Sequence, residues 1–190
     1  MCRGEFLSYF LRSKWDCGGI EPSVVASAEA SRRGIHVYGS TLKDSGLPEK
    51  YFDIITFLDM LYFDPTPLED IQKARQALKD DGLLAIELPG LSYRIMRKFG
   101  PLSLVVNHRW NDFSSPSRHL FYFSESSLHR LLEKAGFQII ETVPEMAPLR
   151  GSVVLQFASR LYFLFSMFLF VVTLKKINVA AKVVYLCQKM

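Results

Sequence analysis

The most strongly patterned stretch of the chain runs from Tyr51 to Asp59, where four large apolar residues follow Asp53 and a second aspartate closes the run. Short continuous apolar runs are typical of strands that are buried on both faces, as in a parallel sheet covered by helices. Ligands of open α/β sheets bind beyond the carboxyl ends of the strands, which is where Asp59 lies. Taken alone, Asp59 is more simply interpreted as a cap for the segment that follows.

The pattern on both sides of this run alternates between helical and strand-like periods. That alternation predicts a doubly wound, Rossmann-like α/β fold with a mostly parallel sheet, helices on both faces and a terminal antiparallel strand pair. The expected helices are 5–14, 23–33 with Pro22 at a first helical position and Gly34 at its end, 68–79 closed by Asp81-Gly82, 91–99, and 125–135 with Ser124 as N-cap and Gly136 at C′. The expected strands are 15–20, 35–38, 51–59, 83–87, 137–143 and 181–187, with loops over 39–50 and 101–123.

Composition narrows the class of protein. A length of 190 residues suits a single domain over 1–190, and the 13% of aromatic residues argues against disorder. A net charge of +4 gives no nucleic-acid signal, although residues 144–190 hold six Lys or Arg against one acid. Three scattered cysteines favour reduced thiols in the cytoplasm, with no disulfide framework and no metal site. Glu5 precedes the short apolar stretch 6–11, which is unlike a secretory signal.

Glu21 is the first candidate for ligand chemistry. It ends the expected strand 15–20, and a carboxylate in that position can accept hydrogen bonds from both hydroxyls of a ribose. NAD enzymes place an acid there too, so a nicotinamide dehydrogenase is a rival interpretation. The Gly-x-Gly-x-x-Gly spacing of those enzymes is not present in the remaining loop, where only Gly4 precedes the first helix.

The series of signals resembles the class I S-adenosylmethionine-dependent methyltransferases, and more narrowly the methyltransferase-domain group that includes ubiquinone-biosynthesis-type enzymes. Each matching stretch is short, but together they follow in the right order and at the right separations up to about Val143. The stretches are Arg3–Leu7, Gly19–Ser23, Gly39–Leu42 with Leu47-Pro48, Phe52–Ile55, Leu78–Leu84, Arg118–Ser124 and Leu131–Phe137.

This resemblance implies S-adenosylmethionine as the cofactor and assigns a role to each matching residue. The implied cofactor residues are Gly4 at the methionine part, Glu21 at the ribose, Thr41 and Leu42 near the adenine, and Leu58 and Asp59 lining the pocket beyond the central strand. Residues 91–123 resemble the substrate-side insertion of the family. In that insertion, Trp110 and Arg118 would contact the acceptor, and His119 could act as a general base on a hydroxyl. The simpler alternative is that Arg118 and His119 hold the insertion in place.

Two departures from the family pattern stand out. The chain begins inside the glycine-rich loop, with Met1 and Cys2 where small residues are expected, and the strand that should precede the loop is missing. Loss of an interior strand would expose two hydrogen-bonding edges, so we expect either an upstream start or a sheet that closes differently. After Asp59, Tyr62-Phe63 replaces the Glu-His pair of many relatives.

An apolar segment, 161–174, lies near the C-terminus between Arg160 and Lys175-Lys176. Its 14 residues would span ~21 Å as a helix, less than the roughly 30 Å hydrocarbon core of a bilayer. Lengthening it back to 153 would bury Arg160. Burial between the last strands or at a homodimer contact is the preferred interpretation of the apolar region 153–176, and peripheral contact with a membrane surface comes close behind.

The sequence therefore predicts methyl transfer from S-adenosylmethionine to a small or lipid-like acceptor, at oxygen. The rival from another class is a non-catalytic methyltransferase-like remnant that acts as a membrane-associated binding or scaffold protein. Its support is the incomplete glycine loop and the lost Glu-His pair.

Overall fold

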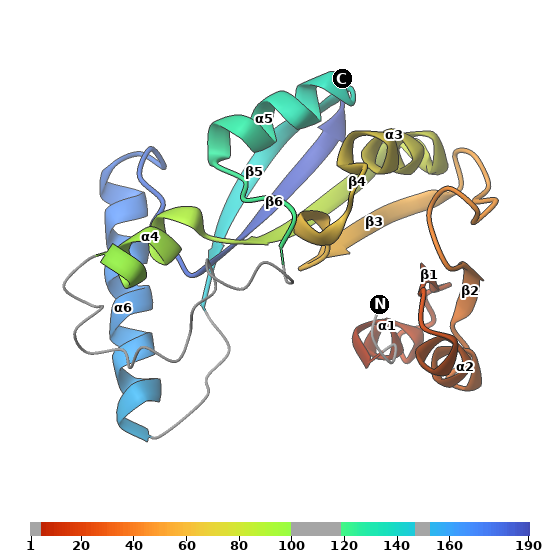
Figure 1. Ribbon diagram of the computed structural model, residues 1–190, viewed down its shortest axis with the longest axis horizontal. Helices are drawn as coiled ribbons and strands as arrows, with labels where there is room; N and C mark the ends of the chain where they lie inside the picture. Colours follow the sequence, from red (N-terminus) through yellow and green to blue (C-terminus); the bar gives the residue numbers. More distant parts are fainter. Residues whose placement is uncertain (1–4, 100–118, 147–152) are drawn as a thin grey trace. The chain divides into compact units, whose positions relative to one another are not determined.

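The computed structural model describes residues 5–99, 119–146 and 153–190 (Figure 1). The chain divides into two compact units, Met1–Tyr51 and Phe52–Met190.

The first unit is a small α/β arrangement with two parallel strands. Its elements are α1 (Glu5–Leu11), β1 (Gly18–Ile20), α2 (Val24–Arg32) and β2 (His36–Gly39). Gly18 pairs with His36, and Gly19 pairs with Val37. All four elements were expected. The prediction that Pro22 is the first residue of the helix was wrong, because α2 begins only at Val24. Ser23 has an extended backbone and is the N-cap of α2, and its hydroxyl accepts a hydrogen bond from the Ala26 amide at 3.3 Å.

The second unit is built on a four-stranded sheet in the order β3-β4-β6-β5. β4 is parallel to β3, and β6 is antiparallel to both β4 and β5, so three strands run in one direction and β6 runs against them. The predicted terminal antiparallel pair is therefore confirmed. The elements are β3 (Phe52–Leu58), the short 3-10 helix η1 (Leu61–Phe63), α3 (Pro67–Ala77), β4 (Leu78–Pro89), α4 (Leu91–Phe99), α5 (Glu125–Lys134), β5 (Phe137–Glu145), α6 (Val153–Val172) and β6 (Lys182–Lys189).

The core of this unit lies between the sheet and the helices α3 and α5, which lie together on one face of the sheet in Figure 1. Alternate residues of the inner strands, such as Leu84 and Ile86 in β4, are fully buried there. From the helices, Ile71 and Leu132 are buried to the same degree. The alternation shows that the sheet buries one face more completely than the other.

Two predictions about strands were wrong. The central run was expected to be buried on both faces, yet β3 is the last strand of its sheet and Ile54 is 43% exposed. The Asp81-Gly82 pair was read as the end of a helix, but it lies inside β4, which begins at Leu78. The pairing register shifts between Phe52 and Ile54, opposite this part of β4, so the Asp-Gly pair marks an irregularity of the strand.

The C-terminal apolar helix is longer than the 14-residue segment 161–174 that the sequence indicates. α6 spans 20 residues from Val153, and Leu174 lies beyond its end. The longer helix does not bury Arg160, which is exposed, so the argument against extending it was wrong. In the part of the chain that the structure describes, no helix is both long and apolar enough to cross a membrane.

Candidate functional site

Glu21 lies directly after β1, at the carboxyl end of the parallel pair. Its backbone amide donates to the Gly39 carbonyl at 3.1 Å, which continues the pairing of the two strands. Its side-chain Oε1 accepts from the Ser23 amide at 3.1 Å, and the residue is only 8% exposed. Burying a carboxylate is costly unless polar groups meet it. The Ser23 amide is one such group.

Thr41 and Leu42 belong to a loop that is held by its own hydrogen bonds. The Thr41 hydroxyl donates to Asp44 Oδ2 at 2.8 Å and accepts from the Asp44 amide at 3.2 Å. The Leu42 carbonyl accepts from the Ser45 hydroxyl at 2.8 Å, and the Leu42 side chain is buried. The loop therefore has a defined conformation that presents Thr41 to solvent.

In the second unit, Asp59 is one of two carboxylates that share a lysine. Lys182 Nζ lies 2.5 Å from Asp59 Oδ2 and also donates to Glu87 Oε1. Asp59 follows β3 in a left-handed conformation (φ 52°), and its amide donates to the Glu87 carbonyl at 3.2 Å. Leu58, the last residue of β3, pairs with Glu87. The ends of three strands thus bring the three charged groups together.

The electrostatics of this cluster follow from its burial. Burial lowers the pKa of Lys182, but the hydrogen bonds to Asp59 and Glu87 outweigh it and leave the pKa of Lys182 raised. Burial also raises the pKa of Glu145, and the nearby charge of Glu87 raises it further. Lys182 is therefore protonated at neutral pH, and its ammonium group donates a hydrogen bond to one carboxylate oxygen of Asp59.

Sequence reasoning missed Glu87 and Lys182 as site residues. Glu87 carried a usable signal, because it ends an apolar run just as Asp59 does. Lys182 carried no such signal, because it is 123 residues from Asp59 in the sequence. The antiparallel pairing of β6 with β4 brings the two side chains together.

His119 is packed among aromatic rings. Its ring lies 4.4 Å from Tyr62 and 5.2 Å from Phe63, centroid to centroid, and it stacks on Phe63. The Leu120 amide donates to the Tyr62 carbonyl at 2.8 Å. The pair that replaces Glu-His after Asp59 therefore supports His119 directly, and this contact could not be read from the sequence.

Arg94 from α4 meets the same group. Its Nη2 lies 3.4 Å from His119 Nε2, and its guanidinium lies 5.7 Å from the centroid of the Tyr122 ring. Because arginine only donates, a hydrogen bond here requires Nε2 of His119 to accept. Burial, followed by the charge of Asp59, raises the pKa of Tyr62 to about 12, so its hydroxyl is protonated at neutral pH.

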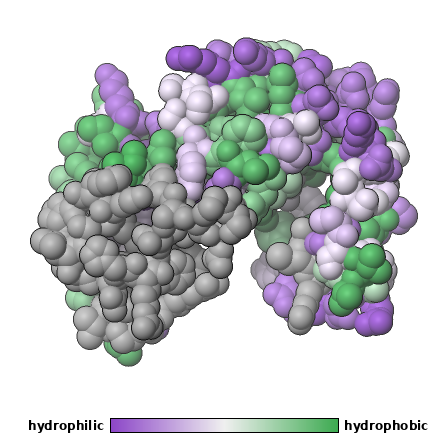
Figure 2. Space-filling model, viewed as in Figure 1, coloured by the Kyte–Doolittle hydropathy of each residue, from purple (hydrophilic) through white to green (hydrophobic). Residues whose placement is uncertain are grey.

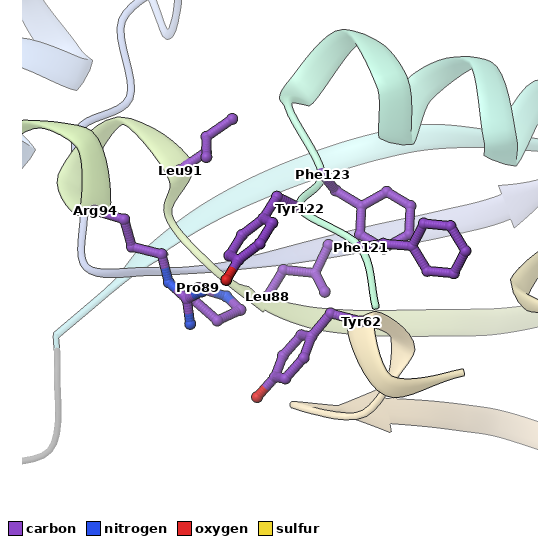
Figure 3. Close-up of a pocket in the computed structure, with 8 residues that line it drawn as sticks. All are labelled: Tyr62, Leu88, Pro89, Leu91, Arg94, Phe121, Tyr122 and Phe123. Carbon is purple, nitrogen blue, oxygen red and sulfur yellow. The ribbon is translucent and has the colours of Figure 1, made fainter. Parts of the chain in front are cut away.

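A shallow pocket adjoins these rings (Figure 3). Figure 3 shows Arg94 and Tyr122 directed toward the same space, while the Phe121 and Phe123 rings lie together on the other side. Its cavity volume is about 10 Å³, room for about one water molecule, so an acceptor would need the lining side chains to move. The lining residues are Tyr62, Leu88, Pro89, Leu91, Arg94, Phe121, Tyr122 and Phe123.

The remaining predicted site residues, Gly4, Trp110 and Arg118, lie outside the described residues. Within the ranges that are described, no group of three or more His, Cys, Asp or Glu could hold a metal ion.

Comparison with known proteins identifies the family. Residues 3–142 match the family model for a methyltransferase domain. No curated protein matches the chain.

Solved structures share the fold at low sequence identity. A protein from Thermotoga maritima, described as a possible histamine N-methyltransferase, is 18% identical with a TM-score of 0.65, over 100% of this chain and 79% of the other. A methyltransferase from Mesorhizobium loti is 15% identical with a TM-score of 0.68, over 99% and 87% of the two chains. The 1,6-didemethyltoxoflavin-N1-methyltransferase of Burkholderia thailandensis, solved with S-adenosylhomocysteine, is 15% identical with a TM-score of 0.57, over 99% and 67%.

The family match covers most of the chain, and the solved structures share its fold. The chain belongs to the methyltransferase-domain family of class I enzymes, whose methyl donor is S-adenosylmethionine.

Proposed function

We propose that this chain transfers the methyl group of S-adenosylmethionine to an oxygen of a small or lipid-like acceptor. The observation that carries the proposal is the buried Glu21 carboxylate, held by the Ser23 amide at the end of β1. The proposed cofactor residues are Gly4, Glu21, Thr41, Leu42, Leu58 and Asp59.

When bound, the cofactor supplies a methyl group already activated by its sulfonium, so the protein's main task is alignment. Glu21 would accept hydrogen bonds from the ribose hydroxyls. Asp59, one oxygen of which is within 2.5 Å of Lys182 Nζ, would contact the cofactor beyond the end of β3. Neither residue needs to move a proton.

On the acceptor side, the aromatic lining of the pocket beside Arg94 supports a planar or apolar substrate. We propose Trp110 and Arg118 as further contacts and His119 as the base that takes a proton from an acceptor hydroxyl. The 3.4 Å contact with Arg94 would have to open for Nε2 of His119 to act as that base. A lipid-like acceptor also calls for contact with lipid, and region 153–176 would provide it or would join two copies of the chain.

The test is transfer of labelled methyl from S-adenosylmethionine to a panel of phenols, long-chain alcohols and matched amines. We expect product with hydroxyl acceptors, little with the amines, and less product from Glu21→Ala than from the wild type at a cofactor concentration that just saturates the wild type. Product with the amines alone would overturn the assignment to oxygen.

A second candidate is a non-catalytic, membrane-associated binding protein. The observation in its favour is that Lys182 already holds Asp59 and Glu87, while Tyr62-Phe63 replaces the Glu-His pair. A folded chain that binds no S-adenosylhomocysteine would support this candidate over the enzyme.

A further inference from the structure

The exposed face of α6 is apolar, whereas the exposed face of a helix on a protein surface is usually polar. Large apolar side chains spaced by three or four residues occupy its exposed face. They are Val153, Phe157, Leu161, Leu164, Phe165, Phe168, Val171 and Val172, each at least half exposed.

The opposite face of α6 packs against its own unit. Ser166 is fully buried and Phe170 is 4% exposed. The Tyr162 hydroxyl donates to the Val179 carbonyl at 2.6 Å, and its ring lies 5.2 Å from the ring of Tyr93 in α4. Among the described residues, α6 is thus anchored on this side by the Tyr162 hydroxyl and by the burial of Ser166 and Phe170, whereas its apolar face is exposed.

The turn that follows α6 continues the same surface. Leu174 and Lys175 both have left-handed backbones, with φ of 52° and 65°, which is costly for residues with side chains. The Lys175 amide donates to the Phe170 carbonyl at 2.7 Å and holds this turn closed. Leu174 is 80% exposed, and Ile177 is 48% exposed beyond the two lysines. Hydrophobic and hydrophilic surfaces adjoin at the top left of Figure 2, where Figure 1 places the end of α6.

The charged residues around this face indicate which kind of partner it binds. Arg160 is exposed on α6, Lys175 and Lys176 are exposed in the turn, and residues 146–190 contain no acid. A symmetric contact between two α6 helices would bring Arg160 against an apolar surface with no carboxylate from either helix, which is unfavourable. Anionic lipid headgroups supply the missing negative charge, and long basic side chains reach them from the edge of a buried apolar face.

We infer that the exposed face of α6, together with the turn 174–177, docks in the plane of an anionic lipid bilayer. The apolar side chains enter the boundary between headgroups and acyl chains, while Arg160, Lys175 and Lys176 meet the headgroups. This inference deepens the proposed lipid-like acceptor but does not depend on methyl transfer.

The test is flotation of the full chain with vesicles of phosphatidylglycerol and phosphatidylcholine, and with vesicles of phosphatidylcholine alone. We expect binding to the anionic vesicles that weakens as salt rises. Phe165→Glu with Phe168→Glu should weaken that binding by at least about tenfold. Lys175→Gln with Lys176→Gln should lower the preference for anionic vesicles by about tenfold.

The matched control is Val24→Glu with Val25→Glu, which adds the same charge at apolar positions of α2 that are more exposed still and should change binding by no more than about threefold. Absence of vesicle binding by the wild type would overturn the inference. A stable dimer of the wild type that the Phe165→Glu, Phe168→Glu variant cannot form would also overturn it. So would a lower thermal midpoint of that variant than of the wild type, because it would show that this face packs against the chain itself. Binding of S-adenosylhomocysteine, measured on the same samples, separates failure of this inference from failure of the proposed function.

Discussion

In the second unit, charged residues at strand ends form one cluster. Lys182 links Asp59 to Glu87, and the side chains of Lys182 and Glu87 are 20% and 14% exposed. The three groups are partly withdrawn from water, so each depends on the others more than a surface ion pair would.

Replacing Lys182 tests how strongly the cluster is coupled. Lys182→Met should lower the free energy of unfolding by about 1–3 kcal/mol, because two partly buried carboxylates lose their cation. The matched control is Lys79→Met, which breaks the exposed 2.7 Å pair with Asp53 and should cost less than about 1 kcal/mol. Chemical denaturation of both variants makes the measurement, and equal effects would show that the cluster behaves as a surface pair.

Asp70 gives the protein a stability that depends on pH. Burial raises the pKa of Asp70 to about 6, with the nearby charge of Asp64 adding to the effect. Between about pH 4 and pH 6, the folded state holds a proton that the unfolded state releases, so the free energy of unfolding falls as pH rises through this range.

Asp70→Asn should remove that dependence and stabilise the protein at pH 7 by about 1 kcal/mol, since Asp70 is only partly buried. Denaturation curves at pH 4, 5, 6 and 7 compare the variant with the wild type. Parallel pH dependences of the two proteins would contradict the assignment to Asp70.

At the scale of elements, local signals predicted best where a cap or a turn residue was involved. Ser124 caps α5 by accepting from the Ser127 amide at 3.2 Å, and Gly136 has the left-handed backbone (φ 82°) that a C′ residue needs. The predicted bounds of α4, 91–99, are those of the structure. The same kind of signal failed at Asp81-Gly82, because a pair typical of turns also suits an irregular strand.

Gly90, at the junction of β4 and α4, is required by a close approach of the backbone. A Cβ added there would lie 2.0 Å from the Ala180 carbonyl oxygen, and the Gly90 amide donates to the Ala181 carbonyl at 3.0 Å. We therefore expect Gly90→Ala to lower the free energy of unfolding by about 3 kcal/mol.

The control is Gly34→Ala, where φ is 84° but, apart from Arg33 and Ile35, no described residue has an atom within 4 Å of the added Cβ, so only backbone strain of about 1 kcal/mol is expected. Thermal and chemical denaturation compare the two variants. A Gly90→Ala protein as stable as the Gly34→Ala protein would show that the junction can move apart.

For the whole molecule, the order of strands and helices was predictable because each element carries its own period and its own end signals. Two groups of contacts were not predictable, because they join residues that are distant in sequence. They are the contact of Asp59 with Lys182 and the contacts of Tyr62 and Phe63 with His119. α6 was predictable as an apolar helix, but which of its faces is exposed depends on packing alone. That both units form a single methyltransferase-like domain stays a prediction.

Binding of the cofactor is tested most directly by calorimetric titration of the wild-type chain, Glu21→Ala and Glu21→Gln with S-adenosylhomocysteine. We expect saturable binding by the wild type, weakened about ten- to a hundredfold in Glu21→Ala, since hydrogen bonds to a charged group contribute about 1.5–3 kcal/mol each. Glu21→Gln keeps one accepting oxygen and should fall between the two. Equal affinity in all three proteins, or no binding by a folded wild-type chain, would contradict this expectation.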